Sequence, residues 1–256
     1  MGIWKKTGRC RPFQQDEGDK KMKDKIVGIL GGMGPEATID LFARIVKHTH
    51  AKKDDDHLRI IIDNNPKMPS RQDAILKGGE SPVPAMRETA RNLERAGADF
   101  IIIGANTPHY FYDEIKDAVR IPFLHIIEEA AKETAKAVPG VRKVGVLATS
   151  AAMKTGLYQK CFEKYGIEVL DIPGEIQDQV QKSIFSFKYD GKTPEVIELI
   201  VGPVRHMIMN GAEALVMGCT EIPIILENME FSVPMIDPNE VIAVAAVQCA
   251  KNQRTL

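Results

Sequence analysis

The sequence has no long hydrophobic run, no excess of charge of either sign and no paired cysteine motif. Its longest apolar segments, such as Phe100–Ile103, are far shorter than the roughly 20 residues that a membrane-spanning helix needs. Its 34 basic and 35 acidic residues give a net charge of −1, so the chain carries no electrostatic footprint for nucleic acid. Neither a membrane nor a nucleic acid is therefore expected as a partner.

Cysteine is also scarce, with single residues at Cys10, Cys161, Cys219 and Cys249. Their wide spacing predicts neither a disulfide framework nor a zinc site, and the acidic run at 54–57 is expected to be a solvated loop rather than a metal site. Residues 1–21 lack the apolar stretch of a secretory signal, and we expect them to be a disordered extension before the domain that starts at Met22. A cytoplasmic protein is predicted.

The chain does contain enough apolar residues, 44% of 256, for one large domain or two smaller ones. From Met22 onward, short apolar runs alternate with longer helical patterns. The predicted strands are Lys25–Leu30, Arg59–Asp63, Phe100–Gly104, Pro122–His125, Lys143–Ala148, Glu168–Ile172, Ala214–Gly218 and Val233–Ile236. The predicted helices are Glu36–His50, Pro82–Ala96, Tyr110–Val119, Glu128–Val138, Tyr158–Tyr165, Thr193–Asn210, Pro223–Asn228 and one from Glu240 onward. Apolar strands between helices are typical of parallel sheets covered on both faces.

Three segments of the first half recur in the second half in the same order. The segment 25–31 (KIVGILG) resembles 143–149 (KVGVLAT), 100–108 (FIIIGANTP) resembles 214–222 (ALVMGCTEI), and 121–124 (IPFL) resembles 233–236 (VPMI). We infer an α/β fold of two similar parallel-sheet domains related by pseudo-twofold symmetry. The predicted first domain comprises residues 22–126 plus 237–256, and the second comprises residues 127–236.

Ligands of parallel sheets bind at the carboxyl ends of the strands. The loops after Leu30, Gly104, Ala148 and Gly218 are therefore expected to line one cleft between the two domains. The loop at 31–38 (GGMGPEAT) joins a strand to a helix, and its backbone N–H groups suit a carboxylate. It fits neither a dinucleotide fingerprint nor a phosphate loop.

Cys219 follows a buried strand at a predicted helix start, a location that lowers the pKa of a thiol and favours a base or nucleophile. Cys161 and Cys249 lie in apolar helical patterns and are expected to pack in the core. Ala105 occupies the repeat position of Cys219, beside Asn106 and Thr107, whose polar groups can orient a ligand. His109 is a weaker candidate for a general acid.

These motifs together resemble the aspartate racemase branch of the aspartate/glutamate racemase superfamily, over nearly the whole chain from Met22. The resemblance is carried by 31–38 (GGMGPEAT), 63–71 (DNNPKMPSR), 105–109 (ANTPH), 154–169 (KTGLYQKCFEKYGIEV), 184–191 (IFSFKYDG), 218–221 (GCTE) and 234–238 (PMIDP). It implies an isomerase with two α/β domains and a cleft between them, no pyridoxal phosphate or other cofactor, no metal, and a homodimer. It also implies two thiols that exchange protons with opposite faces of the substrate's α-carbon.

By this resemblance, Arg71 and Lys188 are the basic residues for the side-chain carboxylate of the substrate. The resemblance further assigns substrate contacts to Met33, Asn106, Thr107, Thr149, Thr220 and Glu221. One position departs from the pattern, because Ala105 stands where relatives with two thiols carry cysteine. Cys219 is therefore the only catalytic thiol that can be assigned.

The expected function is an amino-acid racemase that acts on aspartate or glutamate, with its second thiol missing. Three alternatives stay open: a one-thiol decarboxylase or isomerase of a small dicarboxylate, a catalytically impaired or engineered Cys→Ala variant, and an amino-acid-binding homologue. One-thiol members of the superfamily exist, so Ala105 is also compatible with a natural enzyme.

Overall fold

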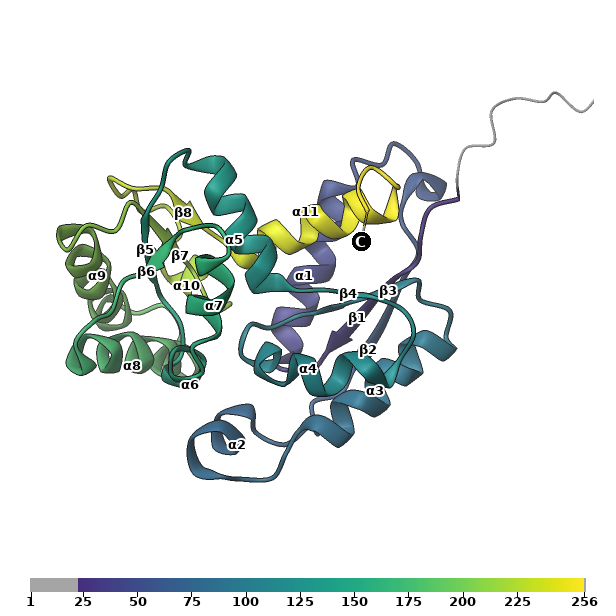
Figure 1. The fold of residues 1–256 in the computed structure, drawn as a ribbon, viewed down its shortest axis with the longest axis horizontal. Coiled ribbons are helices and arrows are strands. Elements are labelled where there is room, and N and C mark those ends of the chain that lie inside the picture. Colours follow the sequence, from purple (N-terminus) through teal and green to yellow (C-terminus); the bar gives the residue numbers. More distant parts are fainter. Residues whose placement is uncertain (1–22, 256) are drawn as a thin grey trace, which may run out of the picture.

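The computed structural model describes residues 23–255, so the expectation of disorder for residues 1–21 falls outside the described residues. The described chain forms two four-stranded sheets in which every pairing is parallel (Figure 1). The first sheet has the order β2 (Ile60–Asn64), β1 (Val27–Gly31), β3 (Phe100–Ile103), β4 (Phe123–Leu124). The second has the order β6 (Glu168–Val169), β5 (Lys143–Val146), β7 (Ala214–Val216), β8 (Met235–Ile236). The two orders are identical when the second set of strands is numbered from β5, which confirms the predicted duplicated α/β fold.

Helices connect the strands within each half. Those of the first half are α1 (Pro35–His48), α2 (Arg71–Lys77), α3 (Val83–Arg95), α4 (Tyr112–Ile115) and α5 (Ile126–Ala137), with short 3₁₀ helices η1 (Asp54–Asp56), η2 (Thr107–Phe111) and η3 (Lys116–Ala118). Those of the second half are α6 (Ser150–Lys154), α7 (Leu157–Glu163), α8 (Gly174–Asp190), α9 (Pro194–Met209), α10 (Ile222–Ile225) and α11 (Pro238–Ala250). No helix within residues 23–255 is long and apolar enough to cross a membrane.

Strand register shows which residues of the two halves are equivalent. Gly28 pairs with Ile101 in the first sheet, and Gly145 pairs with Leu215 in the second. Because Ile101 and Leu215 occupy the same place in their sheets, Gly28 corresponds to Gly145. The alignment of Lys25 with Lys143 in the sequence repeat is therefore wrong by one residue. Both segments are apolar, so their sequences are similar in the predicted alignment and in the one shifted by a residue. The repeat between 100–108 and 214–222 holds in the structure, and it makes Ala105 equivalent to Cys219.

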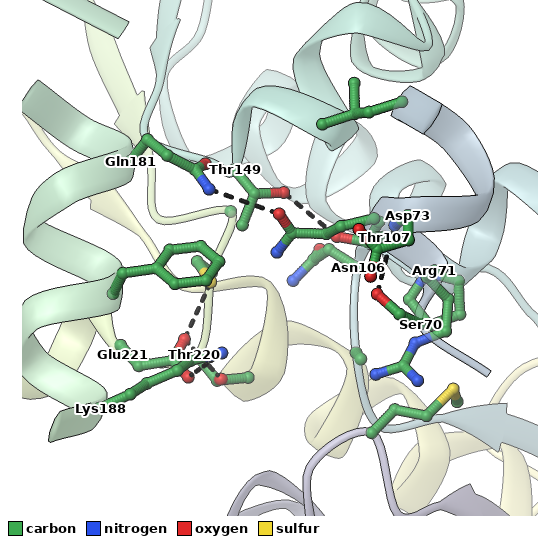
Figure 2. A pocket seen from close by; sticks show the side chains of 18 of the residues that line it. Ser70, Arg71, Asp73, Asn106, Thr107, Thr149, Gln181, Lys188, Thr220 and Glu221 are labelled. Atoms are coloured by element: carbon green, nitrogen blue, oxygen red, sulfur yellow. Dashed lines mark hydrogen bonds and ion pairs between the residues drawn. The ribbon is translucent and has the colours of Figure 1, made fainter. Parts of the chain in front are cut away.

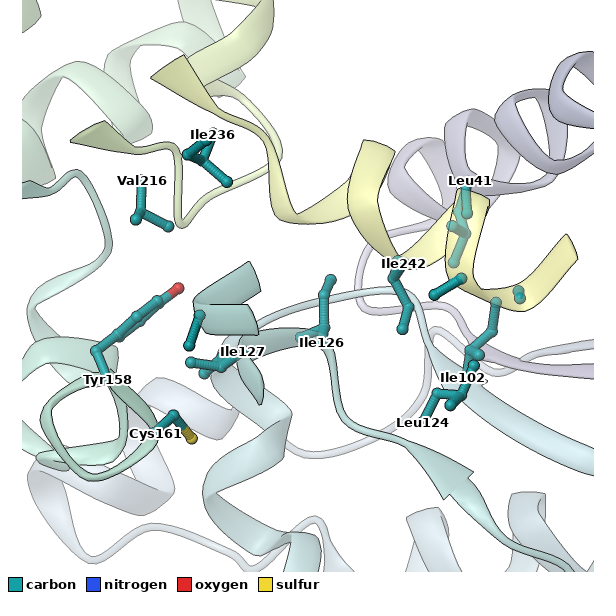
Figure 3. Packing of buried hydrophobic residues seen from close by; sticks show 14 of the residues in the cluster. Leu41, Ile102, Leu124, Ile126, Ile127, Tyr158, Cys161, Val216, Ile236 and Ile242 are labelled. Atoms are coloured by element: carbon teal, nitrogen blue, oxygen red, sulfur yellow. The ribbon is translucent and has the colours of Figure 1, made fainter. Parts of the chain in front are cut away.

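The last helix of each half packs on the other half. Helix α5 follows β4 of the first sheet and packs against α7, whereas α11 follows β8 of the second sheet and packs against α1. The two helices also pack against each other, and Figure 1 shows them between the sheets. One continuous apolar core therefore runs from Leu41 through Ile126 and Ile242 to Tyr158 (Figure 3). This packing fixes the position of the strand ends of one sheet relative to those of the other. The domain boundaries stay a prediction.

Several elements depart from the sequence prediction, and one of them is the unpredicted helix α6. No element was predicted for residues 173–192, yet α8 occupies most of them. The helix was missed because its buried stripe is narrow and consists only of Val180, Ser183 and Ile184. Arg71 was predicted to end a loop but is the first residue of α2, whose N-cap is Ser70, with Oγ accepting from Asp73 N at 3.2 Å. The helix predicted near 110–119 is broken into α4 and 3₁₀ turns.

Candidate active site

A cavity of about 560 Å³ lies between the carboxyl ends of the two sheets. With the exception of His109, its lining includes the residues that the sequence singled out for the site: Met33, Arg71, Ala105, Asn106, Thr107, Thr149, Lys188, Cys219, Thr220 and Glu221. Figure 2 shows two facing walls, with Arg71, Asn106 and Thr107 opposite Lys188, Thr220 and Glu221. The duplicated fold brings these segments together because equivalent strand ends face one cleft.

The first wall carries no titratable group beside Ala105. Ala105 is 8% exposed and contributes a methyl group, and its neighbours in the cavity are Asn106 and Thr107. Asn106 is buried, and its Oδ1 has no hydrogen-bond partner among the described residues. An unpaired buried acceptor is costly, so this oxygen is suited to receive an N–H donor from a ligand.

His109 does not reach the cavity and is not available as a general acid. It is buried, its Nδ1 lies 2.9 Å from the Ala105 carbonyl oxygen, and its Nε2 accepts a hydrogen bond from Ile126 N at 3.3 Å. Because the amide of Ile126 is a donor, Nε2 must be unprotonated and Nδ1 carries the hydrogen. Burial and the neighbouring His125 hold the pKa of His109 well below its ordinary value. Its role is to fix the loop that bears Ala105.

The second wall carries the thiol. Cys219 is partly buried, and its Sγ–H donates to Glu221 Oε2 at 2.8 Å. The Thr220 hydroxyl donates to the same oxygen at 3.0 Å. Beneath them, the buried Tyr158 hydroxyl donates to the Gly218 carbonyl at 3.2 Å and supports the turn.

The expected low pKa of Cys219 is contradicted by its surroundings. Burial and the Glu221 carboxylate raise the pKa of this thiol far above its ordinary value. The helix that follows, α10, spans only Ile222–Ile225, so it supplies little of the N-terminal dipole that the prediction invoked. In the unliganded site, Cys219 is a neutral thiol.

Lys188, near the end of α8, forms an ion pair with Glu221 Oε1 at 3.1 Å. This cation contributes to a lowered pKa of Glu221, although burial acts in the opposite direction. Glu221 therefore stays ionised at neutral pH. Its two carboxylate oxygens are fully engaged, one by Lys188 and the other by Thr220 and Cys219.

Arg71 is the cation of the opposite wall, and it has no carboxylate partner among residues 23–255. Its guanidinium donates to the Pro69 carbonyl at 3.1 Å. Partial burial lowers its pKa, but a guanidinium remains charged at neutral pH. A half-buried Arg without a counter-ion is a natural partner for a carboxylate of the ligand.

Two side-chain hydrogen bonds join the walls. The hydroxyls of Thr107 and Thr149 lie 3.3 Å apart, and Gln181 Nε2 on α8 donates to Gln72 Oε1 on α2 at 3.3 Å (Figure 2). Within the glycine-rich loop, Gly32 N donates to Thr38 Oγ1 at 2.9 Å, so that amide is already occupied. Met33 is the residue of this loop that lines the cavity. Carboxylate binding by the loop stays a prediction.

Residues 30–246 match the model of the Asp/Glu/Hydantoin racemase family. The chain belongs to this family. It is thus an isomerase of the amino-acid racemase class.

Similar proteins span nearly the same length. The broad specificity amino-acid racemase RacX of Bacillus subtilis is 28% identical over 87% of this chain and 96% of its own. The Picrophilus torridus aspartate racemase is 35% identical, with a TM-score of 0.77 over 88% of this chain and 94% of its own. An aspartate racemase homologue from Pyrococcus horikoshii is 28% identical, with a TM-score of 0.73 over 88% of this chain and 99% of its own.

The cavity of this racemase-family chain also contains residues that the sequence analysis missed. They are Ser70, Gln72, Asp73, Leu76, Lys77, Pro108, Gln181, Phe185 and Gly218. Most lie on α2 and α8, two of the helices that the apolar pattern failed to predict. A usable signal exists on α8, where Gln177, Gln181 and Lys188 recur at helical spacing and therefore share one face.

Proposed function

We propose that this protein is a cofactor-independent racemase of aspartate that retains one catalytic thiol, Cys219. At the equivalent position of the opposite wall it has Ala105, which cannot transfer a proton. The enzyme then exchanges the α-hydrogen of one enantiomer with solvent much faster than it interconverts the two enantiomers.

One observation carries this proposal: the cavity holds Cys219 on one wall and Ala105 at the pseudo-symmetric place on the other. Asn106 and Thr107 beside Ala105 have no titratable side chain, and His109 is committed to the backbone of Ala105 and Ile126. Asp73 and Lys77, which also line the cavity from this half, are paired with each other at 2.8 Å. Proton transfer on that face is thus left to water.

Aspartate is supported by the charges of the cavity and by the similarity to aspartate racemases. Arg71 and Lys188 provide two cations on facing walls, as required for a substrate with two carboxylates. The buried Asn106 Oδ1, which has no partner among the described residues, is a suitable acceptor for the substrate's ammonium group.

The proposed reaction begins when the thiolate of Cys219 removes the α-proton. The Cα–H bond breaks, an S–H bond forms, and the electron pair moves into the adjacent carboxylate as an enolate. Return of the proton from Cys219 regenerates the same enantiomer. Delivery from the Ala105 face gives the other enantiomer, and the absence of a positioned acid there is expected to slow it by about 10²–10⁴-fold.

The test is to incubate L-aspartate and D-aspartate separately with the enzyme in deuterated water. We expect deuterium at the α-carbon of one enantiomer with retained configuration, and much slower appearance of its mirror image. Cys219→Ser should abolish this exchange. Equal and rapid interconversion of both enantiomers would refute the one-thiol mechanism, and a protein that binds aspartate without exchange would be a binding homologue.

A homodimer is part of this proposal, by analogy with the family. Sedimentation equilibrium of the full chain tests it, with twice the 28.4 kDa chain mass expected.

A further inference from the structure

Glu221 has an unusual set of partners for a residue assigned to substrate binding. All of its side-chain contacts come from the protein: Sγ of Cys219 at 2.8 Å, Oγ1 of Thr220 at 3.0 Å and Nζ of Lys188 at 3.1 Å. Both carboxylate oxygens therefore have protein partners, and one of these partners is the reacting thiol itself. This arrangement links Lys188 to Cys219 through a single group.

A second cavity, of about 450 Å³, lies behind this group. Lys188, Thr220 and Glu221 line both this cavity and the first one. The rest of its lining is Gly34, Glu36, Ala37, Asp40, Phe187 and Ile224. The Lys188–Glu221 pair therefore forms part of the partition between the two cavities, and the side chain of Lys188, which is 46% exposed, has free space on either side.

Several ionisable groups surround the pair. Tyr158 of α7 lies beneath Gly218, Glu36 and Asp40 of α1 line the second cavity, and Arg71, Asp73 and Lys77 of α2 line the first. Asp73 is paired with Lys77 at 2.8 Å. None of these surrounding groups lies within hydrogen-bond distance of Cys219 Sγ in the described chain, whereas Glu221 does.

We propose that Glu221 is the proton acceptor for Cys219 and that Lys188 controls it, so that the thiolate forms only when a dicarboxylate substrate draws Lys188 away. In the free enzyme, Lys188 holds Glu221 ionised and the thiol stays protonated. A substrate carboxylate in the first cavity competes for the ammonium group of Lys188. Once Glu221 loses this counter-ion it becomes a stronger base.

The proton balance is simple. The S–H bond of Cys219 breaks, its proton forms an O–H bond on Glu221 Oε2, and the sulfur keeps the electron pair as thiolate. The substrate's own ammonium group brings a positive charge into the cavity, and this charge stabilises the negative thiolate. After the thiolate has taken the α-proton, the S–H hydrogen and the Glu221 O–H hydrogen exchange with solvent. Cys219 then protonates the α-carbon, the thiolate takes its proton back from Glu221, and the ionised Glu221 returns to Lys188. Glu221 is thus a positioning residue that acts through Cys219.

This inference rests on the proposed one-thiol function, and its test separates the two. The first measurement is the rate of α-deuterium exchange on the reactive enantiomer from about pH 6 to about pH 9. The wild type should be nearly flat, because the proton moves between two internal groups. Glu221→Gln keeps the shape and can still accept from Cys219 and Thr220 through its amide oxygen, but it loses the ion pair with Lys188 and cannot accept a proton. Its rate should fall by about 10²-fold or more near the acidic end and rise about tenfold per pH unit, because solvent must then remove the thiol proton.

Glu36→Gln is the matched control. It also removes one negative charge from the second cavity, but Glu36 makes no hydrogen bond to Cys219. It should keep the flat profile. A Glu221→Gln profile that runs parallel to the wild type would overturn the inference, because a structural role lowers the rate equally at every pH. Absence of exchange in the wild type would instead refute the proposed function, and the second measurement then decides the inference alone.

The second measurement uses 2-methylaspartate, which has both carboxylates and the ammonium group but no α-hydrogen. Its binding to the wild type at neutral pH should produce the ultraviolet absorption of a thiolate. Cys219→Ser and Glu221→Gln should show none, and Glu36→Gln should match the wild type. Calorimetry reports binding in each case. Binding of 2-methylaspartate without a thiolate signal in the wild type, or no binding at all, contradicts the inference.

Discussion

Replacing Ala105 by cysteine should convert this protein into an efficient racemase. Ala105 lies at the place equivalent to Cys219, and its Cβ borders a cavity of about 560 Å³. One added sulfur atom can therefore enter the cavity without displacing the core. The His109 contact to this residue is to its backbone carbonyl, so the loop should keep its conformation, with a stability change within about 1 kcal/mol.

The expected gain follows from supplying a positioned acid–base group on the second face. Such a group is worth about 10²–10⁴-fold, which corresponds to about 2.7–5.4 kcal/mol of transition-state free energy at 1.36 kcal/mol per factor of ten. Racemisation of each aspartate enantiomer is followed by circular dichroism. Ala105→Ser is the matched control, because a hydroxyl adds similar volume without a readily ionised proton. A folded Ala105→Cys protein that racemises no faster than the wild type would refute the equivalence of the two walls.

Three further outcomes are expected. Arg71→Met should raise KM for aspartate about 10–100-fold, as expected for a lost charged hydrogen bond, and should reduce the preference for aspartate over alanine in exchange kinetics. His125 has its pKa lowered from 6.5 to about 4, mainly by burial. The folded state therefore keeps His125 neutral, and stability present above about pH 6.5 should be lost as pH falls to about 4, by roughly 3 kcal/mol. His125→Asn, whose side-chain oxygen can replace Nδ1 as the acceptor for Glu128 N, should flatten this acid limb in urea unfolding. Gly218→Ala should cost about 1–3 kcal/mol, because its methyl would overlap the Tyr158 hydroxyl and lie 2.9 Å from Ala148 Cβ. The equivalent Gly104→Ala should cost less, since its nearest new contact is Leu41 at 3.5 Å.

Each of these last predictions has a clear contrary result. An unchanged KM in Arg71→Met would exclude Arg71 from carboxylate binding. An acid limb that is the same in His125→Asn and the wild type would assign the pH dependence to other groups. Equal costs for the two glycine substitutions would mean that Tyr158 does not constrain the turn before Cys219.

The sequence was sufficient to predict the duplicated fold and the grouping of residues in the cavity. Buried strands in repeated order place their loops at one edge, so Ala105 and Cys219 could be expected to face one cleft. The alignment of the first strand with its repeat in the second half was wrong by one residue, because the sequences KIVGIL and KVGVLA resemble each other in two alignments. Only the pairing of Gly28 with Ile101 and of Gly145 with Leu215 fixes the correct frame.

The protonation state of the thiol could not be predicted from local sequence. The Gly-Cys-Thr-Glu motif suggested a helix start that would acidify Cys219, whereas the carboxylate two residues later folds back onto the sulfur. That conformation depends on Lys188, which α8 brings from a distant segment. Helix α8 itself escaped prediction because its buried stripe is narrow and its polar face is turned toward the cavity.

The central claim is that the two walls are equivalent and that only one carries a thiol. The double variant Ala105→Cys, Cys219→Ala moves the thiol to the other wall and tests this claim most directly. Solvent deuterium exchange is measured on each aspartate enantiomer for this variant and the wild type. We predict that the preferred enantiomer inverts between the two proteins, with a lower rate for the variant because Thr107, and not a carboxylate, stands where Glu221 stands beside Cys219. Exchange of the same enantiomer by both would contradict the account.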